Sequence, residues 1–406
     1  MKDHESHRKG LTCNVSDEAS PTSQRLTTVL CVFGTRPEAI KMAPVVTELK
    51  KNTSITTRVC VTAQHREMLD QVLDQFNIVP DSDLDLMTPG QSLNDLTAEI
   101  LISMPKVFDV LRPDIVIVHG DTTTAFATAL AAFNQRIPIA HVEAGLRTRN
   151  LQSPWPEELN RTAIAKLADL HFAPTIEAKT NLLTDGVPEN SIHVTGNTIV
   201  DALLAMRNQI SSDKVFAAQF IEQFPFLSSS GDLVLITGHR RENLGARLEN
   251  VCIAISELAK RFPNNAFVYP VHLNPNVLLP VSKILAGLPN VHLVKPVDYL
   301  TMVCLMDRAT LIMTDSGGIQ EEAPSFHVPV LVTRDCTERP EAVRAGTARL
   351  VGASVTKIVE SATELLTSAD ARQQMVSNGN PFGDGTAAVQ IAAAVIAWAT
   401  ARHAST

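Results

Sequence analysis

Short runs of β-branched and apolar residues alternate with amphipathic stretches in two successive series along this chain. Such alternation is typical of βαβ units around a parallel sheet. The first series of candidate strands comprises Val29 to Phe33, Arg58 to Thr62, Ile115 to His119, Ile137 to Val142 and Leu170 to Ala173. The second comprises Leu233 to Thr237, Ala266 to Pro270, Val291 to Val294, Leu311 to Thr314 and Val328 to Thr333. The pattern predicts an α/β protein with two doubly wound sheets.

The length of the chain supports two domains. One hydrophobic core rarely extends beyond about 250 to 300 residues, and the chain has 406. The series of strands pauses near a Pro-, Ser- and Gly-containing segment, Phe224 to Gly231, which we interpret as a linker. Residues 1–25 are polar and are predicted to be a disordered tail without a secretory signal. An Ala-rich helix is expected over Ala387 to Ala401.

Composition excludes several functional classes. The formal net charge is -8 and the basic residues are dispersed, which argues against a nucleic-acid partner. No apolar run approaches the roughly 18 to 20 residues of a membrane helix. The cysteines are far apart and lack metal-ligand spacing, so we expect reduced thiols in a cytoplasmic protein and no metal site. The acidic pairs between Asp81 and Asp85 lie between elements and are not interpreted as metal ligands.

Two polar segments follow the first two predicted strands. Gly34 and Pro37 are suited to a turn and a helix start, where free N–H groups attract phosphate and Arg36 and Lys41 supply positive charge. The alternative is a pair of surface cations at an ordinary helix cap. The second segment, Gln64-His65-Arg66, is interpreted either as part of a site or as a helix cap.

Carboxylates follow the next strands of the first half. Asp121 comes directly after an apolar strand, Glu143 follows the next one, and Glu157 lies in a Pro-bracketed loop. Clustered carboxylates suit acid/base chemistry, because repulsion and desolvation separate their pKa values. Each one alone would more often be a helix cap, as Asp121 could be, or an ion-pair partner for Arg147 or Arg161. As a set they predict proton transfer, and inversion at carbon requires groups on both faces.

The second half carries a candidate phosphate site. A strand, two glycines and a helix start succeed one another at Ser316, Gly317 and Gly318, which lets backbone N–H groups approach a diphosphate. Glu322 follows about one turn later and is suited to ribose hydroxyls. His239 and Arg339 follow two other strands of this half. The structural alternative for the glycine pair is a tight strand-to-helix connection.

Taken together, these segments resemble the non-hydrolysing UDP-N-acetylglucosamine 2-epimerases. The matching strings occur in order from about residue 29 to residue 400. They are FGTRPEAIKMAP, TAQHREMLDQVL, HGDTTT, HVEAGLR, SPWPEELNR, VTGNTIVDAL, TGHRREN, YPVHLNPNV, DSGGIQEEAP, TERPEAV and NPFGDG. The chain departs from the family pattern at Cys336, His327 and Thr386, and it has Gly90 where members activated by substrate often carry Arg.

The resemblance implies a GT-B-like fold of two Rossmann-like domains, with the active site in the cleft between them. It implies a first domain over residues 26–200, joined by a C-terminal helix over 387–403, and a UDP-binding domain over residues 201–386. It also implies a homodimer that needs neither metal nor nicotinamide. UDP-GlcNAc and UDP-ManNAc would interconvert by elimination and re-addition of UDP through a 2-acetamidoglucal.

Site roles follow from the same resemblance. The catalytic set would be Asp121, Glu143, Glu157 and His239. The substrate-binding set would be Arg36, Lys41, Val297, Met302, Ser316, Gly317, Gly318, Glu322 and Arg339, and the regulatory set Gln64, His65 and Arg66. Three other functions remain open: a hydrolysing epimerase that releases ManNAc, a GT-B glycosyltransferase, and a non-catalytic sugar-nucleotide sensor.

Overall fold

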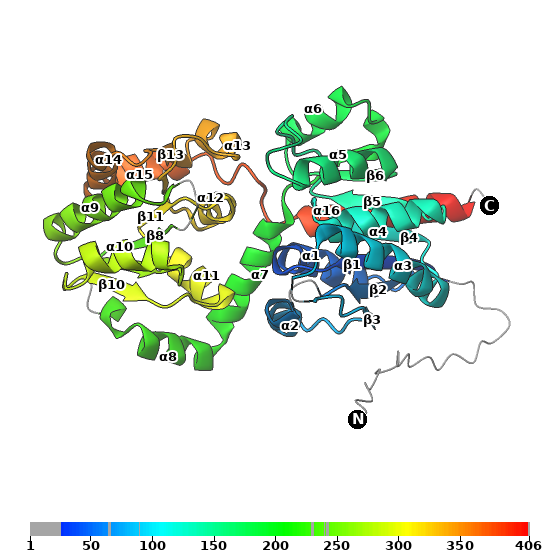
Figure 1. Ribbon diagram of the computed structural model, residues 1–406, viewed down its shortest axis with the longest axis horizontal. Helices are drawn as coiled ribbons and strands as arrows, with labels where there is room; N and C mark the ends of the chain where they lie inside the picture. Colours follow the sequence, from blue (N-terminus) through cyan, green and yellow to red (C-terminus); the bar gives the residue numbers. More distant parts are fainter. Residues whose placement is uncertain are drawn as a thin grey trace, which may run out of the picture. The chain divides into compact units, whose positions relative to one another are not determined.

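The computed structural model describes residues 26–63, 66–88, 90–228, 231–238, 240 and 243–404 (Figure 1). The expectations for the tail at residues 1–25 and for Gln64, His65 and His239 lie outside the described residues, as does the side chain of Arg66. The chain forms two compact units. The first contains the residues up to Thr195 and from Ala388 onward, and the second contains Gly196–Ala387.

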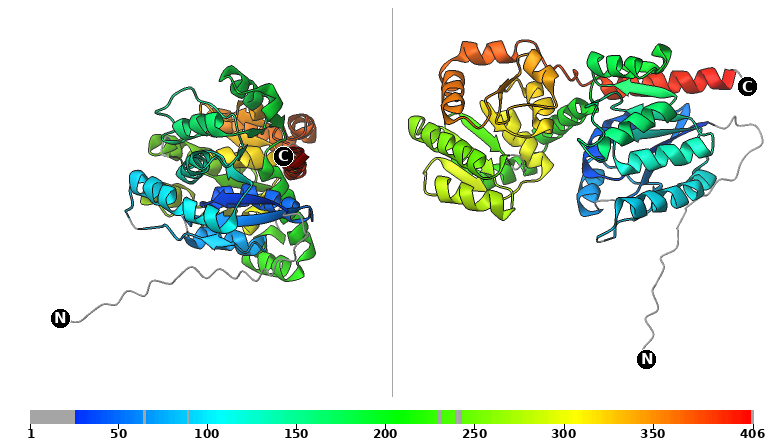
Figure 2. Two further views of the ribbon diagram at one scale, coloured as in Figure 1. Left: turned by 90° about the vertical axis from the view of Figure 1, so that its right-hand side faces the viewer. Right: turned by 45° about the horizontal axis from the view of Figure 1, so that its top comes forward.

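The first unit is built on one parallel sheet of order β3-β2-β1-β4-β5-β6-β7. Its strands are β1 (Thr27–Phe33), β2 (Ile55–Val61), β3 (Ser82–Asp83), β4 (Ile115–His119), β5 (Ile139–Val142), β6 (Leu170–Ala173) and β7 (Ile192–Val194). Its helices are α1 (Arg36–Lys50), α2 (Arg66–Gln75), α3 (Leu93–Leu111), α4 (Thr123–Asn134), α5 (Glu157–Leu167), α6 (Ile176–Thr184), the short η1 (Glu189–Ser191) and α16 (Ala387–Ala404). Figure 2 shows helices on both faces of this sheet.

The second unit repeats this plan with a parallel sheet of order β10-β9-β8-β11-β12-β13. Its strands are β8 (Leu233–Thr237), β9 (Ala266–Pro270), β10 (Val291–Val294), β11 (Leu311–Thr314), β12 (Val330–Val332) and β13 (Ala348–Leu350). Its helices are α7 (Thr198–Ser212), α8 (Lys214–Gln223), η2 (Pro225–Ser228), α9 (Ala246–Arg261), α10 (Pro275–Leu285), α11 (Tyr299–Arg308), α12 (Gly317–Glu322), η4 (Ala323–Phe326), α13 (Pro340–Arg344), α14 (Val355–Thr367) and α15 (Ala369–Val376). The prediction of two doubly wound sheets is confirmed.

The central strands of both sheets are buried along their whole length, and this burial explains why they could be recognised in the sequence. All residues of β1, β4 and β8 are buried, because helices cover both faces of a doubly wound sheet and each strand then reads as a continuous apolar run. One hydrophobic core of the first unit joins β1 and β4 to α3 and α4, and one of the second joins β8 and β9 to α9 and α14.

The linker interpretation of Phe224 to Gly231 is wrong. The boundary between the units falls at Thr195 and Gly196, so this segment lies inside the second unit. Phe224 is 1% exposed and packs its ring on Phe220, while Phe226 stacks on His292. Aromatic burial therefore outweighs the turn composition of the segment.

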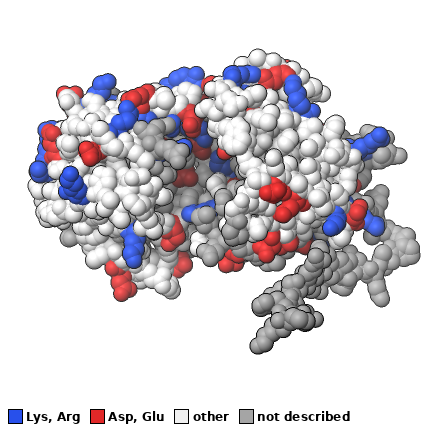
Figure 3. Space-filling model, viewed as in Figure 1, with Lys and Arg blue, Asp and Glu red and all other residues white. Residues whose placement is uncertain are grey.

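The surface of the described residues gives two further observations. Lys and Arg side chains are interspersed with acidic and uncharged ones on the face shown in Figure 3. Among the described helices, none combines the length and the apolar character that crossing a membrane requires.

Candidate active site

The loops that follow β1 and β4 meet where the strand order of the first sheet reverses. Ligands of doubly wound sheets bind outside the carboxyl ends of the strands at such a point. Gly34 allows the loops to approach closely, because an added Cβ would lie 1.9 Å from Thr62 Oγ1 and 2.7 Å from Thr124 Oγ1. These two hydroxyls are hydrogen-bonded to each other at 3.0 Å. A glycine is therefore required for steric reasons, and Arg36 begins α1 two residues later.

Glu38 connects these two loops. Its Oε2 accepts hydrogen bonds from the backbone N–H groups of Gly34 (3.1 Å) and Thr35 (2.8 Å), and its Oε1 accepts from Thr122 Oγ1 (2.6 Å). The side chain is 2% exposed, and burial raises the pKa of its carboxyl while the hydrogen bonds oppose that rise. One buried carboxylate thus fixes the loop of Arg36 against the loop of Asp121.

Asp121 lies between β4 and α4 but does not cap the helix. The N-cap is Thr122, whose Oγ1 accepts from Ala125 N at 3.0 Å, so the capping interpretation of Asp121 is wrong. Its Oδ2 lies 3.5 Å from Arg161 Nε, which confirms an ion-pair role but leaves the carboxylate 28% exposed. Burial raises the pKa of Asp121 to about 6; Arg161 lowers it, the charges of Glu143 and Glu157 raise it, and Lys41 lowers it.

Glu143 follows β5 in a left-handed backbone conformation, with φ of 60°. This conformation costs a non-glycine residue roughly 1 to 2 kcal/mol, and Glu143 shares it with helix-end residues such as Arg112, so it positions the side chain without by itself indicating a function. The Glu143 carboxylate pairs with Lys41 Nζ of α1. Its Oε2 lies 3.8 Å from Nε2 of His119, whose pKa burial lowers to about 4, so this imidazole is neutral near pH 7. Lys41 is therefore placed beside a carboxylate rather than on an open surface.

Glu157 is the first residue of α5, and its charge acts on Asp121 together with that of Glu143. Its Oε2 is buried, and within the part of the chain that the structure describes it makes no hydrogen bond. The three predicted carboxylates thus converge at one edge of the first sheet. Among the described residues, no group of three or more His, Cys, Asp or Glu side chains is arranged to hold a metal ion.

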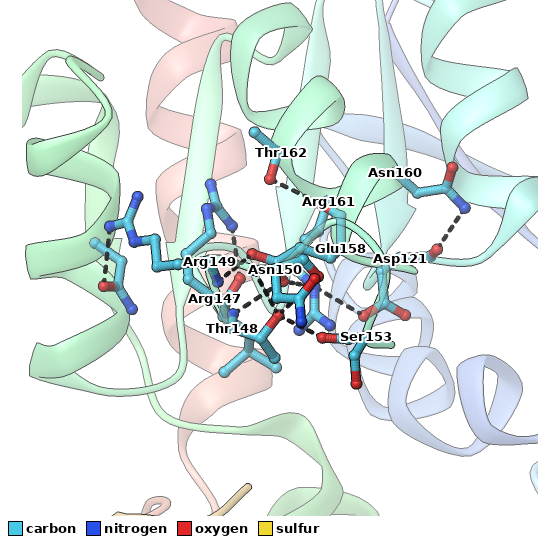
Figure 4. A network of polar contacts seen from close by, with 12 residues as sticks. Asp121, Arg147, Thr148, Arg149, Asn150, Ser153, Glu158, Asn160, Arg161 and Thr162 are labelled. Carbon is cyan, nitrogen blue, oxygen red and sulfur yellow. Dashed lines mark hydrogen bonds and ion pairs between the residues drawn. The ribbon is translucent and has the colours of Figure 1, made fainter. Parts of the chain in front are cut away.

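The first turn of α5 also supports the neighbouring loop (Figure 4). Glu158 accepts hydrogen bonds from the backbone N–H groups of Thr148 (2.9 Å) and Arg149 (2.8 Å) and pairs with Arg161 Nε at 3.1 Å. Arg147 instead pairs with Asp185. Of the two arginines proposed as partners of the carboxylate set, only Arg161 is therefore seen in an ion pair with one of its members.

The second sheet reverses its strand order between β8 and β11, and the loops after these strands also meet. Asp315 is 1% exposed and accepts hydrogen bonds from Arg240 N (2.9 Å) and Asn243 Nδ2 (3.1 Å). At the ends of β8 and β11, the hydroxyls of Thr237 and Thr314 are 2.6 Å apart. The loop after β8 is thus fixed against the loop that carries Ser316, Gly317 and Gly318.

Both basic and acidic side chains lie near the glycine pair of the second unit. An added Cβ on Gly317 would lie 3.9 Å from the Arg240 guanidinium, from Arg339 Cζ and from Glu338 Oε2, and one on Gly318 would lie 4.0 Å from Glu322 Oε1. Arg339 is oriented by an ion pair with Glu321. The structure therefore brings Arg240, Arg339, Gly317, Gly318 and Glu322 into one neighbourhood.

The two remaining predicted substrate contacts lie on another strand-to-helix connection of this unit. Val297 is in the loop between β10 and α11, and Met302 is in the first turns of α11; both are half-buried. They lie on the carboxyl side of β10, which is separated from β8 by β9.

Glu38, His119 and Arg161 of the first unit and Arg240 of the second were absent from the predicted site set. Glu38 carries a signal in the sequence, since Thr35 and Glu38 have capping-box spacing. Nothing in the sequence indicates that it also reaches Thr122, which is 84 positions away. The burial of His119 and the choice of Arg161 as the partner of Asp121 likewise depend on the strand order.

Two doubly wound units with such loops at the carboxyl ends of their strands define the GT-B-like class. A solved structure titled a glycosyltransferase of kitacinnamycin shares this fold at a TM-score of 0.61 and 12% identity. The family model for UDP-N-acetylglucosamine 2-epimerase matches residues 47–396. The chain belongs to the UDP-N-acetylglucosamine 2-epimerase family.

Individual relatives are similar over nearly their whole length. The UDP-N-acetylglucosamine 2-epimerase of Escherichia coli K12 is 54% identical over 89% of this chain and 96% of its own. The solved structure of the Neisseria meningitidis UDP-GlcNAc 2-epimerase bound to UDP-GlcNAc has a TM-score of 0.83 and 51% identity, covering 91% of this chain and 100% of that one. A Methanocaldococcus jannaschii UDP-GlcNAc 2-epimerase in complex with UDP-GlcNAc and UDP has a TM-score of 0.73 and 34% identity, covering 91% and 99%.

Proposed function

We propose that this chain is a non-hydrolysing epimerase that interconverts UDP-N-acetylglucosamine and UDP-N-acetylmannosamine. The observation that carries the proposal is the convergence of Asp121, Glu143 and Glu157 at one sheet edge, with the pKa of Asp121 raised to about 6. A carboxyl that titrates near neutral pH can both accept and donate a proton. The Neisseria relative, which is titled as bound to UDP-GlcNAc, supports the substrate.

The reaction consists of an elimination and its reverse on the other face of the sugar. In the forward step a carboxylate removes the C2 proton, a C1=C2 double bond forms, and the bond from C1 to the UDP oxygen breaks. The products are 2-acetamidoglucal and UDP. In the return step a carboxylic acid delivers a proton to the opposite face of C2, and UDP re-adds to C1. Because the proton leaves one face and arrives at the other, two groups are needed.

The two units divide this work in our proposal. The carboxylates of the first unit transfer protons, and the catalytic role of His239 remains a prediction. Arg36 and the glycine pair of the second unit bind the departing diphosphate, assisted by Arg339, and Glu322 binds the ribose. Arg240 joins this set, because it lies beside Gly317. Lys41 acts through its contact with Glu143 as well as by its charge.

Several family properties remain predictions for this chain. They are the supply of precursors for cell-surface polysaccharide, a cytoplasmic location, assembly as a homodimer, uracil contacts at Val297 and Met302, and a regulatory site at Gln64, His65 and Arg66.

The proposal is tested by incubating the purified protein with UDP-GlcNAc in D2O, without added metal or nicotinamide, and following C2 by NMR. UDP-ManNAc that carries deuterium at C2 is the expected product. Free ManNAc with UDP would replace the proposal by the hydrolysing reaction. Bound but unchanged substrate would overturn it in favour of a glycosyltransferase or a sensor.

A further inference from the structure

Arg161 occupies an unusual position between two carboxylates of different kinds. Arg161 is 7% exposed, and its Nε lies 3.5 Å from Asp121 Oδ2 and 3.1 Å from Glu158 Oε2 (Figure 4). Asp121 is partly open to solvent, whereas Glu158 is 1% exposed. One buried cation is therefore shared between a reactive carboxylate and a structural one.

Glu158 is fixed on both of its oxygens. Backbone N–H groups of Thr148 and Arg149 donate to Oε2 and Oε1, respectively, and the loop that provides them is closed by Thr148 Oγ1 donating to Ser153 O at 2.7 Å. A carboxylate held in this way cannot rotate without losing several hydrogen bonds. Its Oε2 lies 3.1 Å from Arg161 Nε on the same helix face at i, i+3 spacing, so its charge holds the guanidinium beside it, although Nε makes no hydrogen bond within the described part of the chain.

The same helix also holds the backbone at Asp121. Asn160 Nδ2 donates to Asp121 O at 2.9 Å, and Asn160 is 4% exposed. Successive residues of α5 thus contact the main chain and the side chain of Asp121. The helix begins at Glu157, so a single helical segment carries one candidate acid/base group and orients another.

The charges that face Asp121 come from three elements. Glu143 follows β5, Glu157 and Arg161 belong to α5, and Lys41 belongs to α1. The two glutamates disfavour an ionised Asp121. Lys41 favours it but is in contact with Glu143. Among the described residues, Arg161 is the cation within ion-pair distance of Asp121, so it opposes both burial and the neighbouring carboxylates.

We propose that Arg161 is a positioning residue for proton transfer, held by Glu158, which keeps Asp121 oriented and able to ionise. This inference rests on the proposed epimerase function. It assigns to Arg161 no contact with substrate. Its effect is transmitted through Asp121, and it therefore differs from that of an arginine that binds phosphate.

The test compares Arg161→Met with Arg161→Lys in pH profiles of kcat/KM for UDP-GlcNAc. Loss of an adjacent opposite charge is expected to move the Asp121 limb upward by roughly one to three pH units. The direction is the same whether Asp121 acts as base or acid. Lysine retains the charge but not the planar geometry, so Arg161→Lys should show a smaller shift. Affinity for UDP should stay at the wild-type value in both variants.

A matched control is Arg349→Met, which removes an exposed ion pair with Glu364 in the second unit and should leave the profile unchanged. The titration of the Asp121 carboxyl is followed in parallel by 13C NMR in wild type and in Arg161→Lys. This second readout decides the matter if Arg161→Met does not fold.

The outcomes separate the two proposals. If wild type incorporates no deuterium at C2, the epimerase function fails irrespective of Arg161. If wild type epimerises and removal of Arg161 lowers activity equally at every pH, with an unchanged Asp121 titration, Arg161 is only structural and this inference is overturned. A loss of UDP affinity that accounts for the whole defect would overturn it as well.

Discussion

The two units of this chain use the same device at the same topological position. In the first, Glu38 joins the loop after β1 to the loop after β4 through Gly34, Thr35 and Thr122. In the second, Asp315 joins the loop after β11 to the loop after β8 through Arg240 and Asn243. In both units a buried carboxylate joins the two loops at the point where the strand order reverses, and a pair of threonine hydroxyls near the strand ends is also hydrogen-bonded.

The side chains that surround the joined loops differ between the two units. The first places Asp121, Glu143 and Glu157 around the junction and supplies each of the first two with a cation. The second places glycines and arginines there, and its acidic Glu321 is paired with Arg339. Both units thus have a junction fixed by hydrogen bonds, and in the proposed function the loop residues of the first junction chiefly transfer protons while those of the second bind anions.

The strongest challenge to this division is removal of the central carboxylate. Asp121→Asn should lower kcat by roughly a hundredfold to ten-thousandfold, because general acid/base groups contribute on this scale, and it should leave UDP binding by calorimetry unchanged. Asp169→Asn is a matched control, since Asp169 accepts a hydrogen bond from the backbone N–H of Ile139 at the amino-terminal ends of the strands of the same sheet. Turnover of Asp121→Asn near the wild-type rate would remove Asp121 from the acid/base set.

Removing the buried carboxylates that join the loops, Asp315 in the second unit and Glu38 in the first, should produce different functional defects. Asp315→Ala leaves the N–H groups of Arg240 and Asn243 without their acceptor, which costs about 1 to 3 kcal/mol per buried donor in the free energy of unfolding, and it should weaken UDP binding. Glu38→Ala should cost a similar free energy of unfolding but reduce mainly kcat. Chemical denaturation, UDP calorimetry and steady-state kinetics on both variants provide the readouts. Identical kinetic defects would break the proposed division of labour.

The pH dependence of kcat/KM should arise from the titration of Asp121 in the first unit. With the pKa of Asp121 raised to about 6, a base role predicts that kcat/KM falls about tenfold per pH unit below that value. Since the folded pKa is raised, the folded state binds the proton more tightly. The associated stability is present below the ordinary aspartate value and is lost as the pH rises through about 6. Affinity for UDP measured over the same range should not follow this titration.

The smallest effect on stability is expected from the methyl group that Gly318→Ala adds. In Gly318→Ala the new Cβ would meet Ser316 Oγ at 3.9 Å, an ordinary contact, so the free energy of unfolding should change by less than about 1 kcal/mol while UDP affinity falls several-fold. In Gly34→Ala the Cβ would lie 1.9 Å from Thr62 Oγ1, so unfolding itself should become easier by about 1 to 3 kcal/mol. A destabilised Gly318→Ala with normal UDP affinity would contradict an anion-binding role for this turn.

Much of the architecture could be predicted because its strands are buried on both faces. The apolar run at Ile115–His119 can be recognised as a strand from its own sequence, and the polar residues that follow such runs mark the carboxyl ends of the strands. The short strands Ser82–Asp83 and Ala348–Leu350 lack a buried apolar run long enough to show a pattern, whereas the three-residue strand Val330–Val332 lies within such a run. The positions of the first two were therefore not predicted.

Pairings inside the site were beyond prediction for another reason. Lys41 and Glu143 are 102 positions apart and meet only because β1, β4 and β5 are successive strands of the sheet. Arg147 and Arg161 were equivalent candidates in the sequence. Asp185 accepts from the first, so only the folded chain shows that Asp121 faces the second.

The path of the chain through its two units has a consequence for biosynthesis. The first unit is interrupted at Thr195 and is resumed only at Ala388, where α16 brings the buried Ile391 and Val395 to it. On a ribosome that adds about 5 to 20 residues per second, its last helix arrives ten seconds or more after its seventh strand. The second unit, begun later, has all of its residues first. The unit that carries Asp121, Glu143 and Glu157 is therefore started first and completed last, and a chain truncated within α16 would contain all residues of the second unit but only part of the first.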